Sequence, residues 1–143
     1  MTFEDATIID ASGLILGRMA SIIAKRLLMG EHIIIVNAEK AVVSGKRLSI
    51  IQRYKRRLEI GHPGKGPIHP RRPDNIIRKT IKGMLPRYKD KGRFALKRLR
   101  VYIGVPEELK DREFQTINEA RANKLKCPYT TVAEIAREIG WRG

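Results

Sequence analysis

The sequence predicts an α/β fold in which helices pack on both sides of a mainly parallel sheet. A short β-prone run at residues 6–10 is followed by a turn cluster and then by apolar side chains at helical spacing from Leu16 to Leu27. An almost continuous β-branched run comes next, at residues 32–37, and such a run is typical of a strand covered on both faces. Strand, helix and buried strand form a βαβ unit, whose crossover is expected to be right-handed.

The composition indicates a folded chain with a polar surface. The 143 residues are 42% hydrophobic and 31% charged, which excludes wholesale disorder. The longest wholly apolar run, residues 33–36, is far shorter than the roughly 20 residues of a membrane-spanning helix. Cys127 is the single cysteine and has no partner for an internal disulfide. Its length predicts a single domain over residues 1–143. No signal-peptide pattern opens the sequence, so a cytoplasmic location is expected.

The net charge of +15 is concentrated in one stretch of the chain. Residues 46–100 carry 19 Lys and Arg against three acidic residues, a net charge of +16. Residues 1–45 have a net charge of −1, and residues 101–143 carry seven charges of each sign. A short basic run is usually a solvated surface, but an excess gathered in 55 consecutive residues favours a polyanionic partner.

Two helices and an extended loop are predicted within residues 46–100. The first helix is expected to begin with Ser44 as its N-cap and to end near Gly61. At about 100° per residue, its apolar and cationic side chains fall on different faces. The core face holds Ile51, Tyr54 and Leu58, and the cationic face holds Lys46, Arg53 and Arg57.

A loop follows at residues 61–73, in which seven of thirteen residues are Gly or Pro and none is acidic. We expect this loop to be mobile in the free protein and ordered on RNA. A second helix is predicted over residues 74–84, ended by Pro86. Its apolar positions are Ile77, Ile81 and Met84, and its cationic positions are Arg78 and Lys82. Residues 87–98 are basic and contain glycine, and no helix is predicted there.

The last third carries weaker signals. Residues 99–103 alternate between apolar and polar side chains, which predicts a strand. Residues 107–128 are mixed in charge and weakly patterned, so we expect them at the surface. Residues 130–139 predict a helix with a threonine N-cap and one apolar face.

The motifs of nucleotide-dependent and metal-dependent enzymes match poorly. Residues 44–47 keep only the Gly-Lys pair of a phosphate-binding loop. Gly13 and Gly17 have the wrong spacing for a dinucleotide fingerprint and are expected to serve turn geometry and close helix–sheet packing. His62 and His69 have no Cys, Asp or Glu in their loop to complete a metal shell. We therefore predict no catalytic residues, no cofactor and no metal site.

Phosphate binding, in contrast, needs only exposed Lys and Arg and a loop without acidic residues. RNA is favoured over DNA, because no DNA-binding motif is present and a helix-plus-loop surface suits a folded RNA. The segment has three aromatic residues, Tyr54, Tyr88 and Phe94, so a base-stacking platform is not favoured. The predicted RNA-binding residues are Lys46, Arg47, Arg53, Arg56, Arg57, Lys65, His69, Arg71, Arg72, Arg78, Lys82, Arg87, Lys89, Lys91, Arg93, Lys97 and Arg98.

Short sequence blocks carry more information than the charge does. They are DASGLILGRMAS at residues 10–21, VNAE at 36–39, SGK at 44–46, GP at 66–67, RRP at 71–73, GMLP at 83–86, GR at 92–93 and KRL at 97–99. In this order they resemble the universal large-subunit ribosomal protein thirteen family, over about the first 106 residues. The tail at residues 129–141 looks like the archaeal branch of that family.

The resemblance implies a three-layer α/β/α domain around a four-stranded, mostly parallel sheet, with the basic extended loop at its surface. It also implies a structural constituent of the large ribosomal subunit, bound to large-subunit ribosomal RNA beside neighbouring ribosomal proteins. A role in subunit assembly is a further expectation, carried over from bacterial members. The family has no catalytic residues to transfer. No membrane or small-molecule partner is expected.

Two alternatives stay open from the sequence. A nucleotide-dependent enzyme built on the βαβ unit would bind its cofactor near Gly13. A regulator that binds messenger RNA outside the ribosome would use the same basic surface.

Overall fold

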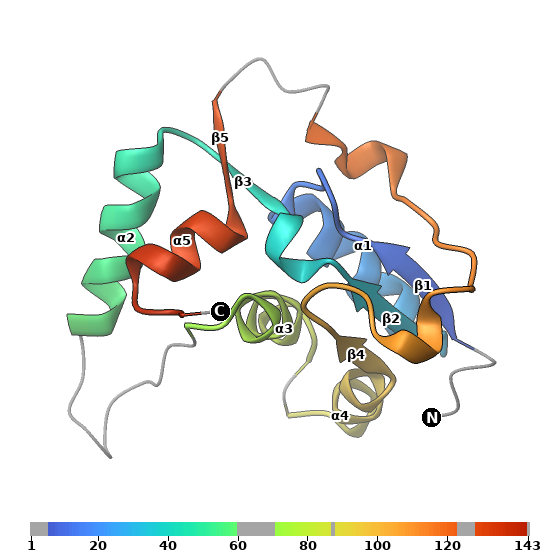
Figure 1. The fold of residues 1–143 in the computed structure, drawn as a ribbon. Helices are drawn as coiled ribbons and strands as arrows, with labels where there is room; N and C mark the ends of the chain where they lie inside the picture. The colour runs from blue at the N-terminus through green and yellow to red at the C-terminus, as the bar shows by residue number, and fades with distance from the viewer. Residues whose placement is uncertain (1–5, 60–70, 87, 123–127, 143) are drawn as a thin grey trace.

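The computed structural model describes residues 6–59, 71–86, 88–122 and 128–142 (Figure 1). Its strands are β1 (Thr7–Asp10), β2 (Ile33–Val36), β3 (Val42–Ser44), β4 (Leu99–Val101) and β5 (Tyr129–Thr131). Its helices are α1 (Leu16–Leu28), α2 (Arg47–Glu59), α3 (Pro73–Gly83), α4 (Asp90–Lys97) and α5 (Val132–Glu138). None of the helices in the described part of the chain is long and apolar enough to span a membrane.

The predicted βαβ unit is confirmed. Strand β1 runs parallel to β2, with Ile9 opposite Ile35, and α1 connects them. Strand β4 also runs parallel to β2 on its other side, so the order across the sheet is β1-β2-β4. All four residues of β2 are buried, which agrees with a central strand covered on both faces. The mixed α/β class therefore follows from the sequence as expected.

The expectation of a four-stranded, mostly parallel sheet is wrong for the described residues, because the parallel sheet there has three strands. On the side of β1 away from β2, the described residues form a single parallel bridge, between Ile9 and Gln115. Strand β3 does not join this sheet. It pairs antiparallel with β5, Val43 opposite Thr130, as a separate two-stranded sheet. The residues of β3 and β5 are far apart in the sequence, and local patterns do not reveal such a pairing.

The expectation of helical layers on both sides of the sheet is also wrong. Helices α1, α3 and α4 share one hydrophobic core with Ile9, Ile33, Ile35 and Leu99 on one face of the sheet. On the other face, Ile8, Ile34 and Val36 pack against the segment that follows β4, which is drawn in orange in Figure 1. In its described residues this segment contains two short 3-10 helices, Glu107–Leu109 and Asn118–Ala120, and no α-helix. The apolar cover comes from Leu109, Tyr102, Val105 and Phe114.

Helix α5 joins this core through Val132, Ala136 and its C-cap residue Ile139, and α2 lies beside α5, on the left in Figure 1. Helix α2 begins at Arg47 and not with Ser44, because Ser44 is the last residue of β3 and pairs with Tyr129. The predicted phase of α2 is confirmed: Ile51 is buried, while Arg53 and Arg57 are exposed. The predicted threonine cap of α5 is also confirmed, since the Thr131 hydroxyl accepts a hydrogen bond of 3.3 Å from the Glu134 amide.

Helix α3 matches its prediction closely, since Ile77 and Ile81 are buried against the core. Met84, predicted on the same apolar face, differs: it lies just after the helix and is 44% exposed. Helix α4 was not predicted at all. The weakly patterned stretch at residues 107–128 also differs from its expected position at the surface, because Leu109, Ile117 and Ala120 are buried within it.

An ion pair joins the end of α1 to the turn before β2, and a hydrogen bond links it to β1. The Arg26 Nε and Nη2 atoms donate hydrogen bonds of 2.6 and 2.7 Å to the Glu31 carboxylate. The Thr7 hydroxyl donates a third, of 3.0 Å. The hydrogen bond from Arg26, partly opposed by burial, lowers the pKa of Glu31. A lowered pKa contributes stability above the unfolded-state pKa, and this stability is lost as the pH falls through the folded-state pKa.

Replacing Glu31 by Gln is therefore expected to lower the free energy of unfolding near neutral pH by about 1 kcal/mol. The difference in unfolding free energy between the variant and the unmodified protein should shrink as the pH falls. At low pH Glu31 becomes protonated and is then neutral, as Gln is. Urea unfolding measured near neutral pH and at the acid end of the stable range checks this. A difference that stays constant over this range would show that the charge of Glu31 does not matter.

Candidate nucleic-acid interface

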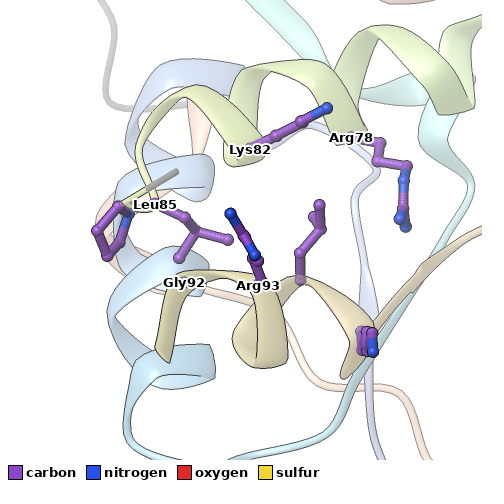
Figure 2. Close-up of a pocket in the computed structure, with 8 residues that line it drawn as sticks. Arg78, Lys82, Leu85, Gly92 and Arg93 are labelled. Carbon is purple, nitrogen blue, oxygen red and sulfur yellow. The ribbon is translucent and has the colours of Figure 1, made fainter. Parts of the chain in front are cut away.

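Four of the predicted RNA-binding residues surround one groove. Arg78 and Lys82 of α3 lie along one side, and Arg93 and Lys97 of α4 lie along the other. Figure 2 shows Arg93 reaching from α4 into the space below α3. The groove has a volume of about 560 Å³, and none of the described residues that line it is acidic. The structure thus concentrates positive charge at a concave site, where the field of each cation adds to the others.

The floor of the groove is apolar. It is formed by Leu85, Pro86, Gly92 and Leu96. Gly92 is buried, and a Cβ atom at this position would overlap the carbonyl oxygen of Pro86. Glycine is therefore required for the turn after α3 to lie against α4. This contact gives the blocks at residues 83–86 and 92–93 a shared structural role, since together they set the floor of the groove.

Helix α2 presents a second cationic surface. Arg53, Arg56 and Arg57 are exposed on it, and the Arg57 guanidinium lies 5.0 Å from the centre of the Tyr54 ring. The opposite face of the helix is fixed by Ile50 and Ile51, which are both buried. Helix α2 packs against α5 and β5, so the C-terminal elements position these arginines.

Arg78, which lines the groove, donates a hydrogen bond of 3.4 Å from its Nη1 atom to the carbonyl oxygen of Leu99. Two further predicted residues contact other elements of the protein. Arg47 forms ion pairs of 3.3 Å with Glu134 and 3.2 Å with Glu138, which join α2 to α5. The Arg98 Nη1 atom donates a hydrogen bond of 2.9 Å to the carbonyl oxygen of Leu27. This carbonyl is in the last turn of α1, and it also accepts a hydrogen bond of 3.1 Å from the Gly30 amide. Both side chains thus hold elements together.

The other predicted residues are placed as follows. Arg72 forms an ion pair of 3.5 Å with Asp74 at the start of α3. Lys46, Arg71, Lys89 and Lys91 are exposed. Lys65, His69 and Arg87 lie outside the described residues, as do residues 61–70 of the predicted loop.

Sequence reasoning named Tyr88 and Phe94 as aromatic residues of the basic segment but missed the apolar floor of the groove. Phe94 is 54% exposed, and the Lys97 Nζ atom lies 5.6 Å from the centre of its ring. Tyr88, just before α4, is 93% exposed. A signal was available, since Gly92, Ala95 and Leu96 recur at helical spacing with Arg93 and Lys97 one turn apart.

The residues around Gly13 form a turn. Gly13 has φ +72°, a conformation that favours glycine, so its expected role in turn geometry is confirmed. Asp10 accepts hydrogen bonds of 2.9 Å from the Ser12 amide and 3.1 Å from the Asn37 side chain. Burial opposes ionisation of Asp10, but these hydrogen bonds outweigh it and lower its pKa. Gly17 is exposed, with open space where a Cβ would lie, so its expected role in close packing is wrong.

Potential metal ligands are scattered in the described part of the chain, where no three His, Cys, Asp or Glu side chains are grouped to hold an ion. His62, His69 and Cys127 lie outside the described residues.

Comparison with known protein families matches residues 4–108 to the family described as Ribosomal protein L13. The match ends before β5 and α5, the elements that support α2.

Individual proteins resemble the chain over nearly its full length. A large ribosomal subunit protein uL13 from Archaeoglobus fulgidus is 51% identical, over 98% of this chain and 91% of that protein. Its counterpart from Methanosarcina barkeri is 50% identical, over 94% of this chain and 97% of that protein. The one from Saccharolobus solfataricus is 43% identical, over 98% of this chain and 96% of that protein. These alignments include the C-terminal elements that lie beyond the family match.

Proposed function

Because the chain belongs to the ribosomal protein L13 family, we propose that it is a structural constituent of the large ribosomal subunit. We infer that it binds large-subunit ribosomal RNA through contacts to backbone phosphates and supports assembly of the subunit. The family is one of non-enzymatic ribosomal proteins. The relatives are archaeal, which agrees with the resemblance of residues 129–141 to the archaeal branch. For a protein of this family, the location that we propose is the ribosome in the cytoplasm.

The observation that carries the phosphate contacts is the groove between α3 and α4. Four cations line it, and none of the described residues that line it is acidic. It belongs to a segment that carries all of the excess positive charge of the chain. Arg and Lys that neutralise phosphates release counterions from the RNA, and this release supplies much of the binding free energy. The exposed arginines of α2 extend the proposed surface to a third helix.

We propose fewer RNA contacts than the sequence predicts, because Arg98 and Arg47 have roles within the protein. Arg98 is assigned to the end of α1, because its guanidinium hydrogen-bonds the Leu27 carbonyl. Arg47 contributes by holding α2 on α5 through Glu134 and Glu138. The remaining members of the predicted set stay proposed RNA contacts. We also propose that residues 1–143 act as one domain and that neighbouring large-subunit proteins are further partners.

The affinity for large-subunit ribosomal RNA is expected to depend steeply on salt. If about 6–10 phosphates are neutralised, the affinity should fall by roughly 10³–10⁵ between about 50 and 200 mM monovalent salt. Filter binding of the full chain to transcribed large-subunit RNA, at increasing potassium chloride, measures this. A competitor transcript of equal length and unrelated sequence separates specific binding from general attraction to a polyanion. An affinity that hardly changes with salt would rule out the phosphate contacts.

A further inference from the structure

We propose that the groove between α3 and α4 holds one unpaired nucleotide of the bound RNA. Its base lies on the apolar floor. The phosphates on either side of the base contact the two cationic rims of the groove, which are Arg78 with Lys82 on α3 and Arg93 with Lys97 on α4. The proposal rests on the RNA-binding function proposed above and assigns a particular element of RNA structure to a particular part of the surface.

The floor is the first argument. A surface that contacts only phosphates has no use for exposed apolar side chains, which are better covered. Pro86 and Leu96 nevertheless line the groove and are only half-buried, beside Leu85, which belongs to the core. The flat face of a nucleobase is a partner that covers apolar side chains without requiring polar groups beneath it. The floor is therefore suited to a base and not to a phosphate.

The size of the groove is the second argument. Its volume of about 560 Å³ lies within the range of roughly 300–1,000 Å³ that small-molecule and cofactor sites occupy. One nucleotide fits such a space, whereas a helical duplex does not enter it. The base must therefore come from a bulge, a loop or an end, where unstacked bases are accessible to proteins.

The rims are the third argument. Arg78 and Lys82 are four positions apart on α3, and Arg93 and Lys97 are four positions apart on α4. Each pair therefore lies about one turn apart along its helix. A strand that places its base between the helices passes cations on both sides. This arrangement fits an anionic backbone that enters along one helix and leaves along the other.

The aromatic side chain of Phe94 is the fourth argument. Lys97 lines the groove and also lies over the Phe94 ring, so Phe94 flanks the outer side of that rim. Its ring is 54% exposed. A base adjacent to the inserted one can stack on it, as bases do on exposed aromatic side chains. Sparse aromatics in the sequence argued against an extended stacking platform, and a single-nucleotide site does not need one.

The test uses the full chain and three matched RNA hairpins with the same stem. The first stem is continuous, the second carries one bulged uridine, and the third carries an abasic residue in place of that uridine. Fluorescence anisotropy at one salt concentration measures each affinity. We expect the bulged hairpin to bind about tenfold more tightly than the other two, because stacking of one base changes affinity by roughly 5- to 150-fold.

A variant then locates the effect in the groove. Leu96→Trp fills the floor without changing any charge, and it should remove the preference for the bulged hairpin over the continuous one. Leu28→Trp, at the exposed end of α1, is the matched control and should keep the preference. Circular dichroism confirms that both variants are folded.

The outcomes separate this proposal from the function on which it rests. Equal affinity for all three hairpins, or no measurable affinity for any, would overturn the nucleotide site, and so would a preference that survives in folded Leu96→Trp. The comparison among hairpins uses the unmodified protein, so it does not depend on the folding of a variant. The phosphate contacts stand or fall separately, on the salt dependence of binding to ribosomal RNA.

Discussion

Reversing the charges of Lys82 and Arg93 to glutamate is expected to lower the affinity for large-subunit ribosomal RNA by about 100-fold or more. The two side chains belong to different helices and lie on opposite sides of the groove. Each substitution removes an attraction to phosphate and adds a repulsion. Like charges placed together at an interface cost several kcal/mol, and every 1.4 kcal/mol is a factor of about ten.

The fold should survive this change, because both side chains are exposed and neither belongs to the hydrophobic core. Circular dichroism and urea unfolding check this point. Filter binding with transcribed large-subunit RNA measures the affinity, and its dependence on salt should become less steep, since fewer phosphates are contacted.

Arg18→Glu with Lys25→Glu is the matched control. It changes the net charge of the protein by the same amount, on exposed positions of α1 outside the basic segment. We expect it to reduce affinity only slightly, through the long-range field. If the control lost as much affinity as the groove variant, binding would depend on total charge and not on the groove.

The parts of the fold that the sequence predicts well are those with a local pattern. The βαβ unit, α1 and α3 follow from the spacing of apolar residues, and the phase of α2 follows in the same way. Each of these elements buries a regular stripe or a continuous run, so its signal is contained in a short window.

The parts that were missed depend on contacts between distant residues. Ser44 is an acceptable helix cap by its chemistry, but it pairs with Tyr129 in a strand. Leu109 lies in a weakly patterned stretch, yet it is fully buried against the far face of the sheet. Helix α4 has few large apolar residues, and its most buried positions are Gly92 and Ala95. Small residues that allow close approach of two segments give almost no periodic signal.

For the candidate site, too, some features follow from the sequence alone and others depend on contacts between distant residues. The charge distribution located the basic segment, because a count of charges needs no structure. It did not reveal that four of the cations share one groove, since this depends on how α4 lies against α3. Nor did it reveal that Arg98 hydrogen-bonds the last turn of α1. Sequence identifies which side chains are available for binding, and tertiary structure decides which of them are grouped.

The position that decides this grouping is Gly92, and Gly92→Ala is expected to destabilise the protein by about 3 kcal/mol. Glycine within a helix is ordinarily less favourable than alanine by about 1 kcal/mol, so the usual effect of this substitution is stabilising. Here the added methyl group would overlap the carbonyl oxygen of Pro86. A backbone atom cannot move aside as a flexible side chain does, so α4 must shift away from the turn that follows α3.

Gly83→Ala is the matched control, because it makes the same chemical change in α3 and meets nothing within 4 Å. We expect it to be neutral or slightly stabilising. Urea unfolding measures both variants, and ribosomal RNA affinity is measured under conditions where each is folded. Because displacement of α4 separates Arg93 and Lys97 from Arg78 and Lys82, folded Gly92→Ala should also bind RNA more weakly than Gly83→Ala. Equal stability and equal affinity of the two variants would mean that α3 and α4 do not need this close contact, and that the groove is not set by Gly92.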